Sequence, residues 1–252
     1  MGWLKDWKRR RVLARHRIDD ALWGAVVAPM PFLRGLSREE LRRLRELALV
    51  FLAEKQFSGA HGLRLDDAMR LSIAVQACLP VLNLGLDRYD VWSEVVVHPG
   101  DFKVRITETD DEGVVHEFDD ERAGESWPGG PVVLSWDAAV NAPDMNVVIH
   151  EFAHKLDMAG GEADGMPPLH SGMDRRAWTE AFRSAYEGFC DAVDRGRDTW
   201  LDPYAAESPG EFFAVVSEAF FEAPNETRRR YPDVYDQLKR YYRQDPAQRL
   251  PT

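Results

Sequence analysis

Hydrophobic positions along the chain recur first with a helical period, then with a strand period, and finally with a helical period again. Ser37 and Glu40 fit a capping box, which predicts a helix to about residue 51, and an apolar run predicts a second helix over 66–79. Alternating and β-branched residues predict short strands over 91–97, 102–107, 114–118 and 131–135, with a turn at 110–113 and a loop over 124–130. Helical patterns return over 178–193, 211–221 and 231–242. This order predicts an α+β fold with a small sheet between mostly helical N- and C-terminal parts.

A further helical segment, before residue 160, carries polar residues with a chemical meaning. His150, Glu151 and His154 form an H-E-x-x-H motif among apolar residues at helical spacing. Side chains four residues apart share one helix face, about 6 Å apart at the base, so two imidazoles can bind one metal ion. Glu151 can then act as general base on a water, and the motif predicts a zinc peptidase. We expect this helix to start within 141–144, with Asp144 as its cap, and to stop at 160–161.

The residues alone do not decide the third metal ligand. A metzincin would have glycine and histidine where Asp157 and Gly160 stand, and a thermolysin-like enzyme would have glutamate where Asp174 stands. His170 lies alone in a Pro-rich loop, where a histidine is more often solvated than metal-bound.

Two acidic residues on a later helix remain as candidates for that ligand. Glu211 and Glu218 share one side of the helix but lie about 10 Å apart along its axis, so only one can bind the same ion. Glu211 also completes a capping box with Ser208, which leaves the two glutamates evenly balanced.

Length and charge limit the broad class of the protein. The chain has 252 residues, 44% of them hydrophobic, which fits a basic N-terminal arm over 1–30 and a single domain over 31–252. A net charge of −11 argues against a nucleic-acid partner. The chain holds no apolar run of 18 residues, so we predict no transmembrane segment. Cys78 and Cys190 are predicted to be buried free thiols, which favours a reducing cytoplasm.

The N-terminal arm differs in charge from the rest of the chain. Residues 1–20 hold seven Lys or Arg against three Asp, and tryptophans are mixed with the arginines. We interpret the arm as a helix lying on the domain rather than as an interfacial membrane helix, because it is short and its apolar face is discontinuous. Its charge further suggests that it lies against the acidic body, near the active-site cleft, and limits access.

Several blocks of this sequence resemble the Mlc titration factor A family of zinc peptidases. They are residues 150–157, Tyr204 with 211–215, residues 77–84, and residues 232–235. The catalytic core of that family is similar to the anthrax lethal factor peptidase domain, which implies a zincin-like core. The resemblance implies zinc held by His150, His154 and Glu211, Glu151 as the general base, and Tyr204 near the metal as a donor to the oxyanion.

The resemblance also implies a function and its alternative. The expected activity is zinc-dependent, aminopeptidase-like hydrolysis of peptide substrates, with the backbone of residues 132–136 holding the substrate as an added strand. The alternative is a regulatory binding protein that sequesters a transcription repressor of sugar uptake, the glucose-responsive Mlc. Nothing in the sequence identifies a repressor-binding surface.

Overall fold

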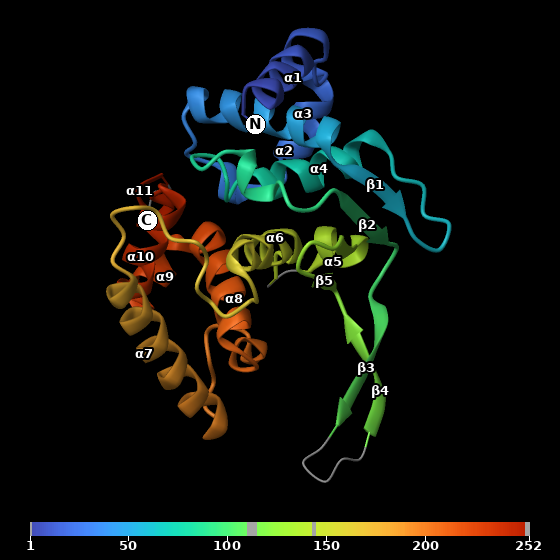
Figure 1. Ribbon diagram of the computed structural model, residues 1–252. Helices are drawn as coiled ribbons and strands as arrows, with labels where there is room; N and C mark the ends of the chain where they lie inside the picture. Colours follow the sequence, from blue (N-terminus) through green and yellow to red (C-terminus); the bar gives the residue numbers. More distant parts are fainter. Residues whose placement is uncertain (1, 110–114, 143–144, 250–252) are drawn as a thin grey trace.

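Four helices form the N-terminal part of the protein. The structure, a computed structural model, describes the backbone of residues 2–109, 115–142 and 145–249, and the side chains of these residues outside 103–121. The helices are α1 (Gly2–Arg15), α2 (Asp20–Val27), α3 (Arg38–Glu54) and α4 (Asp67–Cys78), and they gather at one end of the molecule (Figure 1). The predicted capping box is confirmed, because Ser37 and Glu40 cap α3 reciprocally. Asp66 caps α4 through the backbone N–H of Met69.

The protein also contains a small mixed sheet of four strands. Its strand order is β1 (Gln56–Gly59), β2 (Glu94–His98), β6 (Val132–Ser135) and β5 (Gly124–Ser126). The first three strands are parallel and β5 is antiparallel to β6. The prediction of a loop over 124–130 is therefore wrong in part, since its first three residues pair as a strand. β5 is too short, and β1 too polar, for the alternation that reveals a strand in sequence.

The sheet topology also corrects the expected substrate strand. β6 is paired on both sides, with β2 and with β5, so the backbone of 132–135 has no free edge for an added strand. The edge strands of this sheet are β1 and β5, and β5 lies against α6.

A two-stranded ladder leaves the body beyond this sheet. β3 (Phe102–Thr109) and β4 (Val115–Arg122) pair antiparallel from Phe102 opposite Arg122 outward, and they project from the body (Figure 1). Both strands were predicted, while the predicted turn at 110–113 lies outside the described residues.

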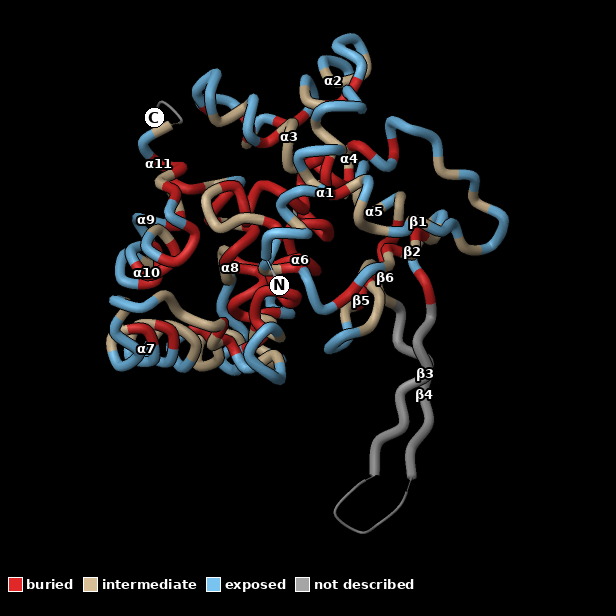
Figure 2. Tube along the Cα trace, turned by 45° about the horizontal axis from the view of Figure 1, so that its top comes forward, coloured by how far each residue is buried: buried red, intermediate tan, exposed pale blue. Residues whose placement is uncertain are grey.

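The C-terminal part is helical and surrounds one central helix, α6 (Val147–Asp157). The other elements here are α5 (Trp136–Asn141), α7 (Arg175–Asp194), α8 (Pro209–Glu222), α9 (Pro224–Arg230), α10 (Pro232–Tyr242) and α11 (Pro246–Arg249), with the short 3-10 turns η3 (Met158–Gly160) and η4 (Pro203–Ala206). Every residue of α6 is buried, and Figure 2 shows the buried segments concentrated along α6 and α8. Phe152 anchors α6 among the rings of Phe51, Tyr89 and Trp92. The α+β class, the small mixed sheet and the helical terminal parts are thus confirmed.

The start of α6 differs from the prediction. Asn146 is its cap, and the Asn146 side chain accepts a hydrogen bond from the backbone N–H of Ile149 at 2.9 Å. The expected cap, Asp144, lies outside the described residues. The helix therefore begins at Val147, later than the start expected within 141–144.

The N-terminal arm lies on the domain but not at the place expected. α1 packs against α3, and Arg9 pairs with Glu54 of α3 and with Asp87 of η2 (Leu86–Tyr89). α1 lies at the far end of the molecule from α8 (Figure 1), so the expectation that the arm covers the cleft is wrong. The acidic groups that attract it are on α3 and near η2. None of the described helices is both long and apolar enough to span a membrane.

The two cysteines are free, as predicted, but they are not equally buried. Cys78 is fully buried at the end of α4, whereas Cys190 on α7 is only half-buried. The Cys190 thiol lies 3.9 Å from the carbonyl oxygen of Ala206.

Candidate metal centre

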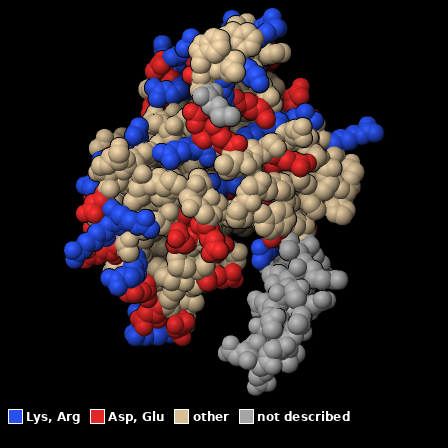
Figure 3. Space-filling model, viewed as in Figure 1, with Lys and Arg blue, Asp and Glu red and all other residues tan. Residues whose placement is uncertain are grey.

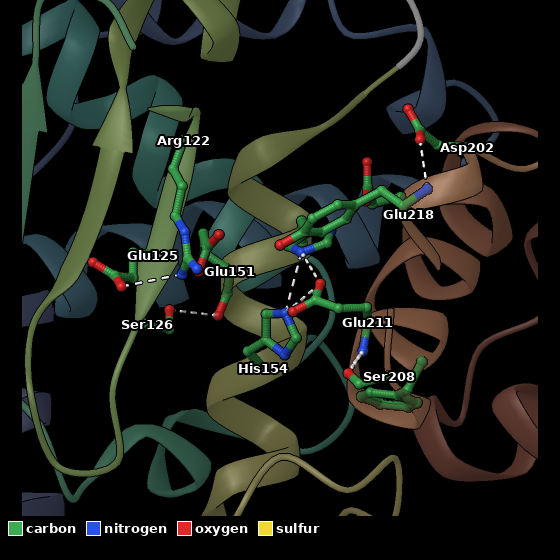
Figure 4. Close-up of polar contacts among 12 residues, drawn as sticks. Arg122, Glu125, Ser126, Glu151, His154, Asp202, Ser208, Glu211 and Glu218 are labelled. Atoms are coloured by element: carbon green, nitrogen blue, oxygen red, sulfur yellow. Dashed lines mark hydrogen bonds and ion pairs between the residues drawn. The ribbon is translucent and has the colours of Figure 1, made fainter. Parts of the chain in front are cut away.

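Three predicted ligands meet where α6 and α8 cross. The Nε2 atoms of His150 and His154 lie 3.1 Å apart. Glu211 Oε2 lies 3.1 Å from the first of these nitrogens and 3.2 Å from the second. Figure 4 shows Glu211 reaching from α8 toward His154 on α6. The helical spacing of the two histidines and the crossing of α8 thus bring residues 61 positions apart to one point.

The distances among these atoms fit a bound metal ion. Zinc bound to nitrogen or oxygen at about 2.0–2.1 Å with tetrahedral geometry separates its ligand atoms by roughly 3.3 Å. The three observed separations are 3.1, 3.1 and 3.2 Å. Two imidazole nitrogens facing each other this closely need a shared cation or a proton, because their lone pairs repel. His150, His154 and Glu211 can therefore hold a metal ion.

Mutual attraction also sets the protonation of this cluster. Burial alone would lower the pKa of His150, but hydrogen bonds with Glu211 and Glu218 outweigh it and raise that pKa well above its ordinary value. Burial would raise the pKa of Glu211, yet the two histidines outweigh it and hold that pKa far below its ordinary range. Glu211 is thus ionised at neutral pH, as a metal ligand must be.

Glu218 lies behind His150 rather than at the convergence point. Its Oε1 is 2.7 Å from His150 Nδ1, and its Oε2 accepts a hydrogen bond from the backbone N–H of Asn146 at 2.7 Å. A carboxylate on the second nitrogen fixes the ring orientation and makes Nε2 a better donor to a metal. The sequence alone left Glu211 and Glu218 as equal candidates for the third metal ligand. In the structure Glu211 faces both histidines, whereas Glu218 orients only His150.

Asn146 extends this support to neighbouring helices. Its side-chain nitrogen donates to Gln76 Oε1 of α4 and to Glu222 Oε1 of α8, both at 2.9 Å. The residue therefore caps α6, holds Glu218 and ties three helices together. The local sequence offered only the preference of asparagine for caps, so this wider role was missed.

Glu151 projects from α6 toward the edge strand β5. Figure 4 shows it on the side of Arg122 and Ser126, away from Glu211. The Ser126 hydroxyl donates to the Glu151 backbone carbonyl at 3.2 Å, while Glu151 Oε2 is buried without a hydrogen-bond partner among the described residues. Burial raises the pKa of Glu151, against the opposing charges of the two histidines. A buried carboxylate with a raised pKa suits proton abstraction.

Gly124 of β5 makes room for that carboxylate. A Cβ at this position would lie 2.4 Å from Glu151 Oε1 and 2.7 Å from Val147 Cγ2. No side chain larger than hydrogen fits there without moving Glu151. Sequence reasoning placed this glycine in a loop and missed its contact, which depends on pairing between β5 and β6.

Tyr204 stands beside the histidines on η4. The centroid of its ring is 6.3 Å from that of the His150 ring. Its backbone N–H donates a hydrogen bond to Asp202 Oδ1 at 2.8 Å. Burial, followed by the charge of Glu211, raises the Tyr204 pKa above its ordinary value, so the phenol keeps its proton at neutral pH. Tyr204 remains 39% exposed, whereas His150 and His154 are each only 6% exposed.

Lys155 fastens the segment after β5 to the metal helix. Its Nζ donates to the carbonyl oxygens of Trp127 at 2.6 Å and Gly130 at 2.8 Å, and burial lowers its pKa to about 8. At the other end of β5, Arg122 pairs with Glu125 at 3.1 Å and points toward Glu151 (Figure 4). Neither basic residue was singled out from sequence, because a Lys or Arg beside a motif normally reads as a solvated group.

The end of α6 positions the start of α8. Asp157 Oδ2 accepts a hydrogen bond from the backbone N–H of Gly165 at 2.7 Å. The segment at Gly165 passes so close to α8 that an added Cβ would lie 2.7 Å from the Pro209 carbonyl oxygen. Ala163 approaches Gly210 in the same way. Because positions 165 and 210 are glycines, the segment around residues 163–165 can pack closely against the first turn of α8, which carries Glu211.

His170 has a structural role instead. Its Nε2 lies 2.8 Å from the Tyr241 carbonyl oxygen, its Nδ1 lies 3.1 Å from Arg88, and its ring stacks on Tyr241. His170 takes no part in the metal cluster of His150, His154 and Glu211, but both of its ring nitrogens contact protein groups, so it is not the solvated histidine expected from the sequence.

Comparisons with known proteins point to a family of metallopeptidases. A family profile described as glucose-regulated metallo-peptidase M90 matches residues 4–243. The chain is 41% identical over 236 residues to Mlc titration factor A of Pectobacterium atrosepticum, which covers 90% of this chain and 88% of that protein. It is 37% identical over 252 residues to Mlc titration factor A of Salmonella arizonae, covering 97% and 98%. An uncharacterised Synechocystis protein is 37% identical over 251 residues, covering 97% and 90%.

Proposed function

This chain belongs to the M90 family of metallopeptidases, and we propose that it is a zinc-dependent peptidase with an aminopeptidase-like preference for short peptides. The observation that carries the proposal is the convergence of His150 Nε2, His154 Nε2 and Glu211 Oε2 within 3.1–3.2 Å. Two nitrogen ligands and one carboxylate are the donor set of many catalytic zinc sites, which keep a further position open. The aminopeptidase-like preference rests on the family resemblance.

When bound, zinc lowers the pKa of water toward ~7 and polarises the scissile carbonyl. Glu151 then serves as the general base: it takes a proton from the attacking water and passes it to the leaving amine. Its buried, unpaired Oε2 and raised pKa support this role. The narrow space at Gly124 keeps the carboxylate in one position between α6 and β5.

Tyr204 is proposed to stabilise the oxyanion. Its hydroxyl stays protonated at neutral pH because its pKa is raised, so it can donate a hydrogen bond to developing negative charge. Its place beside His150 and its partial exposure support this role.

The free edge of β5 is proposed to hold the peptide substrate. β5 is the edge strand beside α6, and Gly124 of this strand touches Glu151. A peptide added along this edge would gain backbone hydrogen bonds while its scissile bond lay near the general base. Lys155 keeps the following segment in place through two carbonyl groups.

Metal analysis of purified variants tests the proposal. Glu211→Ala should lose zinc and all hydrolysis of chromogenic amino-acid substrates, since a ligand is gone. Glu218→Gln should keep zinc but bind it about 10–100-fold more weakly, because it removes the charge behind His150 and leaves one accepting oxygen where Glu218 has two. Glu187→Ala, an exposed change on α7, is the matched control and should equal the parent. Loss of zinc in Glu218→Gln but not in Glu211→Ala would reverse the assignment.

A second function is favoured by the names of the relatives. The Pectobacterium and Salmonella proteins are each named a titration factor of Mlc. We propose repressor binding as a separate candidate, on a surface distinct from the metal cluster. Titrating the Mlc repressor from Pectobacterium with the parent and with Glu151→Gln tests this candidate. Equal binding by both proteins supports a separate regulatory role, and no binding by the parent rejects it.

A further inference from the structure

Helix α1 turns its largest apolar side chains to solvent. Trp3, Leu4 and Trp7 are 76%, 61% and 48% exposed, and no residue of α1 is buried. These three residues are spaced i, i+1 and i+4, so they lie along one side of the helix.

Helix α1 is attached to the rest of the protein by its opposite side. On its other side, Lys5 pairs with Asp90, and Arg9 binds Glu54 at 2.8 Å. Val12 and Leu13 pack against the core. The tryptophans therefore face outward because the opposite side of α1 is the attached one.

Positive charge surrounds the exposed side chains. α1 carries six Lys or Arg and one Asp, a net charge of +5, so the rest of this −11 chain carries −16. Lys8, Arg10 and Arg11 are exposed, and the Arg11 guanidinium lies 5.2 Å from the centre of the Trp7 ring. Figure 3 shows an uncharged patch flanked by basic side chains at the end of the molecule where α1 lies.

We propose that this face of α1 docks on an anionic phospholipid surface. Tryptophan and leucine enter the boundary between headgroups and acyl chains, while neighbouring Lys and Arg bind anionic headgroups. Exposed tryptophan sets this face apart from a purely electrostatic nucleic-acid surface, and the −16 body would repel a polyanion that extends beyond α1. The inference is independent of the proposed peptidase activity, because α1 does not contribute to the metal cluster.

Sedimentation with lipid vesicles tests the proposal. The full chain should bind vesicles of equal phosphatidylcholine and phosphatidylglycerol, and bind pure phosphatidylcholine much more weakly. Binding should fall as salt shortens the Debye length from about 8 Å to about 3 Å. Arg10→Glu/Arg11→Glu and Trp3→Ser/Trp7→Ser should each weaken binding to the anionic vesicles by at least about ten-fold.

Matched changes elsewhere on the surface provide the controls. Arg175→Glu/Arg176→Glu makes the same charge reversal at exposed positions on α7, and Trp127→Ser removes a tryptophan that is 45% exposed. Both should bind like the parent, and circular dichroism checks that every variant is folded. The proposal is overturned by failure of the parent to bind anionic vesicles, by equal binding to neutral vesicles, or by equal losses in the controls. It is also overturned if the α1 variants keep vesicle binding and instead change the apparent mass, which would mark a face between protein copies.

Discussion

Helices α6 and α1 differ in how far their residues are buried. Every residue of α6 is buried, including His150, Glu151 and Lys155, whereas α1 has no buried residue and exposes Trp3 and Trp7. Charged groups inside and tryptophans outside both contradict the usual distribution of residues. Each exception marks a place where the sequence departs from what folding alone favours, and such places are expected at functional sites.

The two exceptions are stabilised differently. In α6 several buried polar atoms are matched, as when Glu218 binds both His150 and the Asn146 backbone at 2.7 Å. Glu151 Oε2, His154 Nδ1 and Asp157 Oδ1 have no hydrogen-bond partner among the described residues. In α1 the exposed apolar groups are unmatched, and ion pairs on the opposite side hold the helix. A change in α6 should therefore alter chemistry or folding, while a change on the exposed face of α1 should alter association.

The largest effect is expected for Glu151→Gln. The amide keeps the shape of the side chain against Gly124 but cannot accept a proton, so turnover should fall on the order of 10³-fold. Zinc content and thermal stability should stay near the parent values, because Glu151 is not one of the three converging residues. Steady-state kinetics with metal analysis measures both, and Glu187→Gln serves as the control. A variant that binds zinc and turns over like the parent would remove Glu151 from the mechanism.

A smaller loss is expected for Tyr204→Phe. The phenol donates to charge that exists only in the transition state, so kcat should fall about 10²-fold while KM changes little. Tyr231→Phe, a half-buried tyrosine between α9 and α10, controls for the loss of a hydroxyl. Equal kcat in Tyr204→Phe and the parent would leave Tyr204 with a packing role.

The metal ligands show how much of the site could be predicted from the sequence. His150 and His154 could be paired from spacing alone, because four residues on a helix fix their separation. The choice of Glu211 over Glu218 needed the crossing of α6 and α8, which no local pattern contains. The family resemblance nevertheless pointed to Glu211.

The features that could not be predicted from the sequence are those without a regular pattern of hydrophobic residues. β5 has three residues, and its role follows from pairing with β6 and from the closeness of Gly124 to Glu151. The outward face of α1 was also underestimated, since a discontinuous apolar pattern does not say which side packs on the body. The attachment depends on Asp90 and Glu54, which lie far from α1 in sequence.

The next prediction concerns the pH dependence of stability through Asp157. Burial raises its pKa from 3.8 to about 7, so the folded state favours the protonated form. Its contribution to stability is fully present below about pH 4 and is lost as pH rises through 7. An amide in place of this carboxyl cannot ionise, and its oxygen can still accept the Gly165 N–H. Asp157→Asn should therefore gain free energy of unfolding relative to the parent as pH rises, by at most about 4 kcal/mol.

Urea unfolding of chelator-treated protein across this pH range measures that difference. Glu187→Gln removes an exposed carboxyl and should show no comparable trend. A difference between Asp157→Asn and the parent that does not change with pH would show that Asp157 is ionised in the folded protein without cost.

The smallest effect is expected for Arg9→Ala in α1. Arg9 bridges Glu54 at 2.8 Å and Asp87 at 2.6 Å, but both carboxylates are partly or largely solvated, so the pairs are screened. The variant should lose about 1 kcal/mol or less of the free energy of unfolding. Lys155→Met in α6 is the matched comparison. It removes the Lys155 donor from the Gly130 carbonyl and one of two donors from the Trp127 carbonyl, which also accepts from the Gly130 N–H at 3.0 Å. Leaving the Gly130 carbonyl without that donor should cost roughly 1–3 kcal/mol. Urea unfolding measures both variants at one pH. An equal loss in the two would mean that α1 is as integral to the fold as α6, and the contrast between an internal helix and an attached one would fail.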